Sequence, residues 1–417
     1  MEWPAPEELL RRARALPAVA AVVRRLTGGP EVRVAMVGGA VRDLLLGLGV
    51  GDVDLAVEGP VEPVLARLGG PARSHVRFGT ATVDVDGARV DLARARRERY
   101  ARPGALPEVA PATLEDDLRR RDFTVNALAL PVTGEGAGQL LAVPEARADL
   151  QSGRLRVLHP ASFLDDPTRL FRLARYRARL GFEIEPGTAE LARRAIDGGA
   201  LRTLTGSRIG HEIELACTEA DPVAAWVAIG ELGLDGAVEP GFGVHDATLA
   251  GRALALLPPD GRPEVVLLAL AVAGLESERR PGLLDLLGVG ARVRDDALLV
   301  AGRAPQTTAV LRSARRASEI AAAVEDTSAG AELAAVAGAF GAEAPARRWL
   351  EVLRHQRLEI GGDDLLRAGV APGPALGAGL VAARAALLDG GAGSREEQLA
   401  EALRGAREAR RAAGEAG

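Results

Sequence analysis

The pattern of hydrophobic and polar positions divides the chain into an N-terminal third of interleaved helices and strands and a helical remainder. Apolar residues recur at helical spacing over residues 5–27, which predicts a helix. An apolar run over residues 32–37 predicts a short buried strand. Gly38-Gly39 then predicts a turn into a second helix, which ends before Gly47.

Further strands are expected before residue 145. Residues 53–57 predict a buried strand, and residues 76–85 alternate in part as a strand does. Asp86-Gly87 supplies the residue types that a two-residue type I′ hairpin needs, so a partner strand over residues 88–92 should follow.

From about residue 162 onward, helical patterns are separated by glycine and proline turns, with almost no strand-like alternation. We therefore expect an α+β chain in which a small mixed sheet with flanking helices is followed by all-helical parts. The expected boundaries give three domains, at residues 1–145, 146–218 and 219–417.

The composition is ordinary for a globular protein, with 47% hydrophobic and 26% charged residues among 417. No stretch near the N-terminus reaches the roughly 18 uninterrupted apolar residues of a membrane span, so no membrane association and no signal peptide are expected. The single cysteine, Cys217, excludes a disulfide framework or a cysteine zinc site and is expected to be buried. A reducing cytoplasm fits this usage.

Two aspartates stand two residues apart at the start of the strand predicted for residues 53–57. Period-two geometry would turn the carboxylates of Asp52 and Asp54 to one face, where they would repel unless a cation lay between them. Mg²⁺ prefers such oxygens, and Asp91 on a neighbouring strand could supply a third carboxylate for a two-metal site. The alternative is a solvated strand edge with ordinary aspartates.

The Gly38-Gly39 turn strengthens the catalytic interpretation. It follows a strand and opens a helix, where backbone N–H groups favour a phosphate and glycine lets the phosphate approach closely. Arg42 lies in the first helical turn and is expected to reach a phosphate oxygen. The spacing is not that of a dinucleotide-binding fingerprint, and the turn alone is a weak signal.

Taken together, these motifs resemble those of the bacterial CCA-adding enzyme and poly(A) polymerase family, the class II polymerase-beta-like nucleotidyltransferases. The resemblance rests on VGGAVRDLLLG at residues 37–47, on Asp52-Val53-Asp54, on residues 91–107 and on residues 115–129. It implies a nucleotidyltransferase head over residues 1–145, a neck over 146–218 that recognises the base, and a body and tail over 219–417 that bind tRNA.

The resemblance also implies roles for individual residues. Asp52, Asp54 and Asp91 would be catalytic, with Mg²⁺ held by Asp52 and Asp54. Arg96, Glu98 and Tyr100 would belong to a flexible loop. The residues expected to bind the nucleotide are Gly38, Gly39, Arg42, Arg120, Arg121, Asp122, Asn126, Asp166, Arg169, Arg172 and Arg175. Which of the two arginines at 120 and 121 positions the nucleotide stays open.

The segment that begins at Asp165-Asp166-Pro167 predicts a helix with arginines along one side. By itself this stripe is typical of a solvated face. The resemblance implies instead that Asp166 and Arg169 read the base. Cytosine and adenine each place an amine donor beside a ring-nitrogen acceptor, which suits a carboxylate with a guanidinium, whereas uracil and guanine present the reverse. Asp165 stands where the family usually has glutamate, which puts base fidelity in doubt.

The partners implied are tRNA, CTP and ATP. The net charge of −5 is unusual for a nucleic-acid protein, but residues 154–212 hold eleven arginines and seven acids, and the chain has no lysine. Aromatic residues make up only 3%, so recognition of a folded RNA by shape and phosphates is expected over base stacking. The sequence does not indicate an oligomeric state.

Other functions remain open at this stage. A poly(A) polymerase, or an enzyme that adds only A or only CC, would share the same motifs. The full-length segment from Asp91 to Glu115 disfavours a cytidine-only enzyme, which by resemblance tends to shorten that loop. A non-catalytic RNA-binding protein is disfavoured by intact Asp52 and Asp54. His245-Asp246 resembles part of a phosphohydrolase motif, but with only five histidines in the chain a structural role is expected.

Overall fold

A seven-stranded mixed sheet forms the centre of the N-terminal part, in the order β3-β4-β5-β2-β1-β8-β9. The computed structural model describes residues 3–75 and 79–413. The strands are β1 (Val34–Val37), β2 (Asp54–Val57), β3 (Ala72–His75), β4 (Thr80–Val85), β5 (Ala88–Arg94), β8 (Leu128–Thr133) and β9 (Leu141–Ala142). A mixed sheet with flanking helices is what the sequence predicted.

The centre of the sheet brings the first functional residues together. β1 is buried along its whole length between β2 and β8, with which it pairs in antiparallel fashion. β2 and β5 are parallel neighbours, and their register sets Asp54 opposite Asp91. The two aspartates, far apart in sequence, therefore lie side by side.

The hairpin between β4 and β5 confirms the prediction made for Asp86-Gly87. Val85 pairs with Ala88, and the two turn residues have φ angles of 53° and 81°, as a type I′ turn requires. Of the predicted strand over residues 76–85, residues 76–78 lie outside the described part of the chain. β4 begins at Thr80.

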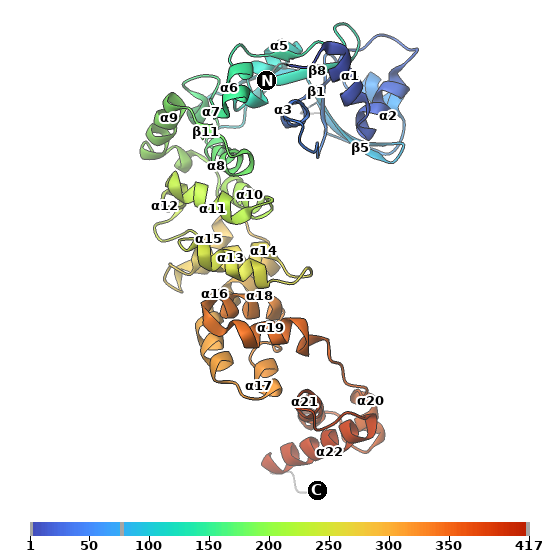
Figure 1. Cartoon of the computed structure of the whole chain (residues 1–417), viewed down its shortest axis with the longest axis vertical. Coiled ribbons are helices and arrows are strands. Elements are labelled where there is room, and N and C mark those ends of the chain that lie inside the picture. The colour runs from blue at the N-terminus through green and yellow to red at the C-terminus, as the bar shows by residue number, and fades with distance from the viewer. Residues whose placement is uncertain (1–2, 76–78, 414–417) are drawn as a thin grey trace. The chain divides into compact units, whose positions relative to one another are not determined.

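The single helix predicted over residues 5–27 is wrong. Two helices form instead, α1 (Pro6–Arg14) and α2 (Pro17–Leu26), because Pro17 has no N–H to continue α1 and starts a new helix. Both pack against the sheet, with α2 on β4, β5 and β8 (Figure 1). α3 (Gly39–Leu46) matches its prediction and ends at Gly47, whose φ is 70°.

A second departure lies in the segment after β5. It forms a two-stranded antiparallel ribbon of β6 (Arg96–Arg99) and β7 (Glu108–Pro111), which we call the loop ribbon. The helix α5 (Leu114–Arg119) and the short η2 (Thr124–Asn126) lead from the ribbon back to the sheet. No strands were predicted here, since the arginine-rich sequence shows no clear alternation.

The segment expected to be an all-helical neck also contains strands. Its helices are α6 (Ala146–Ser152), α7 (Ser162–Asp165), α8 (Thr168–Leu180), α9 (Pro186–Asp197), η3 (Ala200–Thr203) and α10 (Gly206–Cys217). Between them β10 (Arg154–Leu155) pairs in parallel with β11 (Glu183–Ile184). Two residues per strand leave no periodic signal in the sequence, which explains why this ladder was missed.

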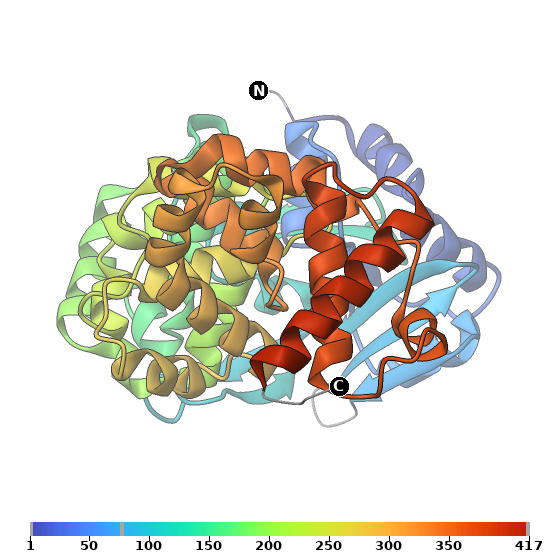
Figure 2. The same cartoon turned by 90° about the horizontal axis from the view of Figure 1, so that it is seen from below.

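The rest of the described chain is helical, as expected. Its helices are α4 (Glu62–Leu68, in the N-terminal part), α11 (Pro222–Glu231), α12 (Leu234–Val238), α13 (Ala247–Leu256), α14 (Pro263–Val272), α15 (Arg279–Leu286), α16 (Ala291–Ser313), α17 (Ala317–Ala322), α18 (Gly330–Ala337), η4 (Gly338–Ala342), α19 (Glu343–Glu351), η5 (Leu353–His355), α20 (Gly362–Arg367), α21 (Pro374–Leu388) and α22 (Arg395–Ala412). Figure 2 shows α21 and α22 packed side by side.

The chain divides into two compact units. The first comprises residues 1–212 and 231–237, and the second residues 213–230 and 238–417. The expected head and most of the expected neck, up to Glu212, thus fall in the first unit, and the division into three domains stays a prediction. None of the described helices combines the length and apolar character needed to cross a membrane.

In the second unit Asp246 caps α13 by accepting from the Leu249 N–H, which is the structural role expected for it.

Candidate functional site

The turn between β1 and α3 approaches an arginine as closely as a glycine permits. Gly38 has a φ of 71°, and a Cβ there would lie 2.8 Å from Nη1 of Arg121. A side chain at this position would therefore push the guanidinium away. Since the turn also opens α3, it offers backbone N–H groups and a cation to one phosphate-sized space.

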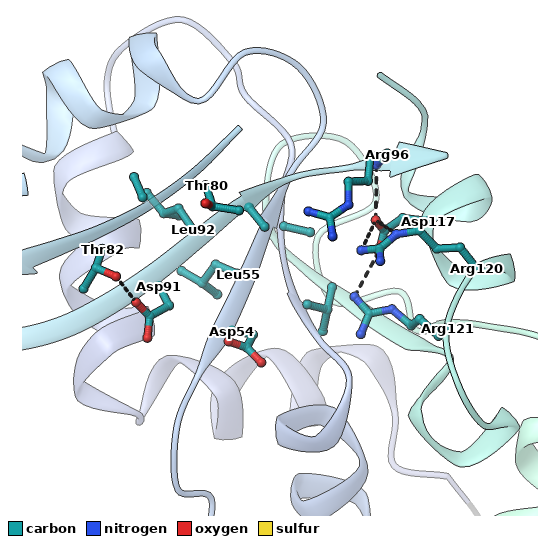
Figure 3. A pocket seen from close by; sticks show the side chains of 14 residues that line it. Asp54, Leu55, Thr80, Thr82, Asp91, Leu92, Arg96, Asp117, Arg120 and Arg121 are labelled. Atoms are coloured by element: carbon teal, nitrogen blue, oxygen red, sulfur yellow. Dashed lines mark hydrogen bonds and ion pairs between the residues drawn. The ribbon is translucent and has the colours of Figure 1, made fainter. Parts of the chain in front are cut away.

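Asp54 and Asp91 line an open pocket of about 340 Å³ on the sheet (Figure 3). Asp91 accepts a short hydrogen bond from the hydroxyl of Thr82 on β4. Partial loss of hydration raises the pKa of Asp54, and the negative charges of Asp91 and Asp52 add to this, against the opposing charge of Arg121. The carboxylates thus form a region of concentrated negative charge.

Asp52 does not lie on the strand with Asp54, contrary to the prediction from the sequence pattern. β2 begins at Asp54, so Asp52 occupies an exposed bend before the strand and does not share its alternation. Among residues 3–75 and 79–413, no three histidine, cysteine, aspartate or glutamate side chains are close enough to form a ready metal site. Asp54 and Asp91 nevertheless suit a divalent cation by chemistry, because a cation would offset both the loss of hydration and the smaller carboxylate repulsion that raise the pKa of Asp54.

Asp117 on α5 holds the two arginines whose roles the sequence left open. Its buried carboxylate accepts from Nε of Arg120 through Oδ1, at 2.8 Å, and from Nη2 of Arg121 through Oδ2, at 2.9 Å. The arginines then diverge, since Arg121 reaches Gly38 while Arg120 donates to Glu98 at 2.8 Å. Arg121 is therefore the one that lies beside the Gly38 turn. Asp117 was not among the predicted residues.

The loop residues predicted as a motif form one cluster. Glu98 accepts from Arg96 at 3.0 Å, from Arg120 at 2.8 Å and from the hydroxyl of Tyr100 at 2.9 Å. Burial and the adjacent Glu98 carboxylate raise the pKa of Tyr100, so the phenol stays protonated and keeps donating. The loop ribbon is thereby fastened through Arg120 to Asp117 on α5.

Most of the predicted nucleotide-binding residues meet in a second open pocket of about 440 Å³. Those that line it are Gly38, Gly39, Arg120, Arg121, Asp122, Asn126, Asp166, Arg169 and Arg172, and the predicted catalytic Asp54 and loop residues Arg96, Glu98 and Tyr100 line it as well. Residues from widely separated segments of the first unit therefore line the same pocket, and the Gly38 turn and Asp54 form part of its wall.

Asp122 connects this pocket wall to α8. One carboxylate oxygen accepts from Nε and Nη2 of Arg172, at 2.8 and 2.6 Å, and the other accepts from the side chain of Asn126 and the N–H of Phe123. Burial opposes ionisation, but the Arg172 charge and these bonds outweigh it and lower the pKa of Asp122. The pair stays ionised inside the protein.

Arg42 is not placed as predicted. Its guanidinium is 1% exposed, donates to Asn126 at 2.6 Å and to Asp43 at 2.8 Å, and does not line the pocket. The first helical turn allowed either direction, and the buried Asn126 acceptor lies on the inner side. Arg42 therefore supports Asn126 and is not placed to contact a phosphate directly.

The base-reading pair predicted on α8 has defined surroundings. Oδ1 of Asp166 accepts from the N–H and hydroxyl of Thr168, at 3.2 and 2.7 Å, and from Arg208 at 2.8 Å. Arg169 is buried and donates to the hydroxyl of Ser162 and to the carbonyl of Arg120, both at 2.7 Å.

Asp165 does not orient Arg169. Its ion-pair partner in the described chain is His159, with Nε2 and Oδ2 4.0 Å apart. Since Ser162 and the Arg120 carbonyl hold Arg169, the shorter side chain at position 165 leaves that arginine anchored. The structure gives no reason to expect reduced fidelity from this departure.

The arginine stripe of α8 is not a solvated face. Arg169 and Arg175 are buried and Arg172 is paired with Asp122. Arg175 forms an ion pair with Glu212 at 2.8 Å and does not line the pocket, so its predicted contact with the nucleotide is not supported. It anchors α8 to α10 instead.

Several pocket residues were missed by the sequence analysis. They are Leu106, Pro107, Thr168, Tyr176, Arg208 and Glu212. Tyr176 lies on the predicted helix, one turn beyond Arg172, and helical spacing could have found it. Arg208 and Glu212 come from α10, whose approach to the pocket is set by tertiary packing and leaves no local signal.

The expected arginine excess over residues 154–212 is largely taken up by internal pairs. Arg156 pairs with Asp149, Arg172 with Asp122, Arg175 with Glu212, and Arg193 and Arg194 with Glu190. The net count of charges therefore overstates the positive surface that is available to an RNA backbone.

Comparison with known proteins agrees with this geometry. Residues 34–156 match the family described as the poly A polymerase head domain. An A-adding tRNA nucleotidyltransferase of Geobacter sulfurreducens is 44% identical over 232 residues, which are 54% of this chain and 26% of that protein. A CC-adding tRNA nucleotidyltransferase of Deinococcus radiodurans is 45% identical over 199 residues, or 46% of this chain and 52% of the relative. The chain thus spans about a quarter to a half of these relatives.

A solved structure extends the similarity to nearly all of the chain. The CCA-adding enzyme of Thermotoga maritima, complexed with tRNA, superposes with a TM-score of 0.76 and 26% identity, covering 97% of this chain and 99% of that one. The matched head-domain segment contains Gly38, Asp54, Asp91 and Glu98. Residues 34–156 therefore match the poly A polymerase head domain, and nearly the whole chain shares the fold of a CCA-adding enzyme.

Proposed function

We propose that this protein is a CCA tRNA nucleotidyltransferase, which adds C and A from CTP and ATP to the 3′ end of tRNA. The observation that carries the proposal is the 440 Å³ pocket, into which the phosphate turn, the catalytic strand and the base-reading helix all project. Gly38, Asp54 and Asp166 come from segments far apart in sequence, yet they line one space. The names of the compared relatives support nucleotidyl transfer to tRNA, and the solved structure that superposes on nearly the whole chain is a CCA-adding enzyme.

In the proposed reaction the incoming nucleotide lies with its triphosphate at the Gly38-Gly39 turn and its base between Asp166 and Arg169. Arg121 neutralises phosphate charge beside the turn. The terminal ribose hydroxyl of the RNA attacks the α-phosphate, a new P–O bond forms, the hydroxyl proton passes to solvent and pyrophosphate leaves with the electron pair.

Mg²⁺ is proposed as the cofactor, with Asp54 and Asp91 as its holders and Asp52 completing the set from the bend before β2. A divalent ion at these carboxylates supplies charge stabilisation to the phosphates and lowers the pKa of the attacking hydroxyl. The chain's own contribution is to hold two carboxylates in register on parallel strands, with Thr82 fixing Asp91. A cytoplasmic location belongs to the same proposal, since the single cysteine is a free thiol.

The base pocket explains the proposed choice of nucleotides. The three donors on Asp166 all meet Oδ1, and no described residue donates to Oδ2, which remains to accept an exocyclic amine. The guanidinium of Arg169 can donate to a ring nitrogen. Uracil or guanine would set a carbonyl against Asp166, at a cost of about 1–3 kcal/mol for each unpaired buried group.

The proposal is tested by incubating the purified protein with Mg²⁺ and tRNA that ends before CCA, with CTP, ATP or both, and sequencing the products. Addition of CCA only when both nucleotides are present is expected. If two cytidines are added with CTP alone, and no adenosine is added when both nucleotides are present, the protein is a CC-adding enzyme. Long A tails with ATP identify a poly(A) polymerase.

An A-adding enzyme is the second candidate, favoured by the name of the Geobacter sulfurreducens relative. Such an enzyme would leave tRNA that ends before CCA unchanged with CTP alone and would extend tRNA that already ends in CC. Running both RNA substrates side by side separates it from a full CCA enzyme.

The catalytic assignment has its own control. Asp54→Ala removes one of the two paired carboxylates and is expected to lower incorporation at least a hundredfold, whereas Asp84→Ala, on the exposed side of β4, should act as the unaltered protein does. Equal activity in both variants would refute the site. No incorporation by the unaltered protein on any RNA would favour a non-catalytic RNA-binding protein.

A further inference from the structure

Arg208 on α10 joins two parts of the pocket that sequence separates widely. Its Nη2 donates to Oδ1 of Asp166 and its Nη1 donates to the carbonyl oxygen of Gly104, each at 2.8 Å. Gly104 lies between the two strands of the loop ribbon. One guanidinium therefore holds both the base-reading carboxylate and the ribbon tip.

The ribbon tip is docked at this point by more than one contact. The N–H of Gly104 donates to the carbonyl of Leu164, two residues before Asp166, at 3.1 Å. Gly104 has a φ of 68°, and a Cβ there would lie 2.1 Å from Oγ1 of Thr203. Only glycine fits, so the backbone of the ribbon approaches the neck as closely as it can.

The contact has a direct effect on the geometry of Asp166. Because Arg208 and Thr168 all donate to Oδ1, they fix the rotation of the carboxylate and direct Oδ2 away from their own donors. Both carboxylate oxygens are chemically alike, so without the Arg208 bond the group has less reason to keep this orientation. An oxygen that rotates freely discriminates poorly between an amine and a carbonyl.

We propose that Arg208 is a positioning residue for base choice, which holds Asp166 in its base-reading orientation when the ribbon tip at Gly104 is docked. The inference rests on the proposed function and deepens it. Arg208 touches neither Asp54 nor Asp91, so its effect is on the selection and binding of the base. The ligand class is a nucleobase with an amine donor beside a ring-nitrogen acceptor, as in cytosine and adenine.

The test compares Arg208→Met, which keeps the length but removes all donors, with Arg208→Lys, which keeps the charge. The full chain is used, and kcat and KM are measured for CTP, UTP, ATP and GTP on tRNA lacking its CCA end. Arg208→Met is expected to lower the kcat/KM preference for CTP over UTP about tenfold, mainly through a higher KM for CTP. Arg208→Lys should recover part of that preference.

Two further variants separate positioning from a general loss of structure. Arg194→Met is a matched control, because Arg194 is an exposed arginine on α9 whose ion-pair partner in the described part of the chain is Glu190, and it should keep the full preference. Gly104→Ala undocks the ribbon tip without altering Arg208 and should reproduce the loss seen with Arg208→Met. If Arg208→Met does not fold, as judged by its circular dichroism, Gly104→Ala carries the test.

Direct binding separates failure of this inference from failure of the proposed function. Equilibrium binding of the four nucleotides with Mg²⁺ is measured by calorimetry without RNA. A protein that binds CTP over UTP but extends no RNA refutes the function, and loss of that preference in Arg208→Met still supports the inference. An unchanged CTP-to-UTP ratio in both Arg208→Met and Gly104→Ala would overturn it.

Discussion

Tyr176 lies among three arginines in the wall of the nucleotide pocket. The guanidinium carbons of Arg42, Arg172 and Arg179 are 5.4, 5.3 and 5.7 Å from the centre of its ring, and its hydroxyl accepts from Arg172 at 2.9 Å. Each cation–π contact contributes about 0.5–2 kcal/mol. The ring thus stabilises a set of like charges that would otherwise repel one another close to the proposed triphosphate site.

Removing the ring should therefore matter more than removing the hydroxyl. We expect Tyr176→Leu to raise the KM for CTP and ATP about tenfold, because Arg172 loses the ring that holds it. Tyr176→Phe keeps the ring and should change KM about twofold. Steady-state kinetics on both variants checks this, and similar KM values for the two would contradict the role given to the ring.

Gly38 allows a residue-level test of the phosphate turn. Alanine at this position has the strain of a φ of 71° and meets Arg121, whereas alanine at Gly47, with a φ of 70°, has no atom within 4 Å. Gly47→Ala, in the left-handed helical region with a ψ of 22°, should cost about 1 kcal/mol of stability, and Gly38→Ala should cost more, because its ψ of −136° lies in a region that only glycine adopts readily. Only Gly38→Ala is expected to lower kcat/KM, by at least tenfold, and equal kinetic losses would show that backbone strain alone is responsible.

At the scale of elements, helix α8 connects the residues proposed to recognise the base with the segment that follows α5. It carries Arg169, Arg172 and Tyr176, and the Asp122–Arg172 ion pair fixes it to the segment after α5. Since Asp122 is buried, loss of its charge would leave the half-buried guanidinium of Arg172 without its counter-ion. The position of the helix therefore depends on the ionisation of one carboxylate.

This dependence predicts how stability changes with pH. The pKa of Asp122 is lowered in the folded protein, so its contribution is fully present above the unfolded carboxyl pKa of about 3.9 and is lost as the pH falls through the lower folded value. The thermal midpoint of the unaltered protein should exceed that of Asp122→Asn at pH 7, with the gap closing below about pH 4. A gap that does not narrow at all as the pH falls below 4 would contradict the assignment.

The elements also show which parts of the structure could be predicted from the sequence. The Asp86-Gly87 hairpin, the Gly38-Gly39 turn and the Asp54–Asp91 pair were predictable, because turn chemistry and strand alternation are local properties. Asp117 and Arg208 were not, since their partners lie far away in the sequence. The inward direction of Arg42 depends on Asn126, which local periodicity does not place beside it.

At the scale of the whole molecule, the chain has two units with separate cores. In the second unit, Cys217 is buried close to Trp226, which also packs edge-on against Phe242 at 5.6 Å. Burial raises the pKa of the Cys217 thiol to about 12. The only thiol in the chain therefore reports on the integrity of the second unit.

The folded protein should accordingly resist thiol reagents. At pH 8 very little of Cys217 is thiolate, and burial blocks access, so alkylation is expected to be at least a hundredfold slower than in urea-unfolded protein. Labelling across a urea series should follow the unfolding of the second unit. Rapid labelling without urea, in protein whose circular dichroism is native, would contradict the burial of this side chain.

The carboxylate of Asp117 is shared between Arg120 and Arg121, so residues 117, 120 and 121 are expected to be conserved together in evolution. A related protein that lost this acid alone would keep two arginines without their common counter-ion. Arg120, which holds the loop ribbon, and Arg121, which lies beside the Gly38 turn, would then both change position. Acidic residues at position 117 should consequently persist wherever both arginines do. Evolutionary replacements here are expected to arrive in pairs, which a broad collection of related sequences would reveal.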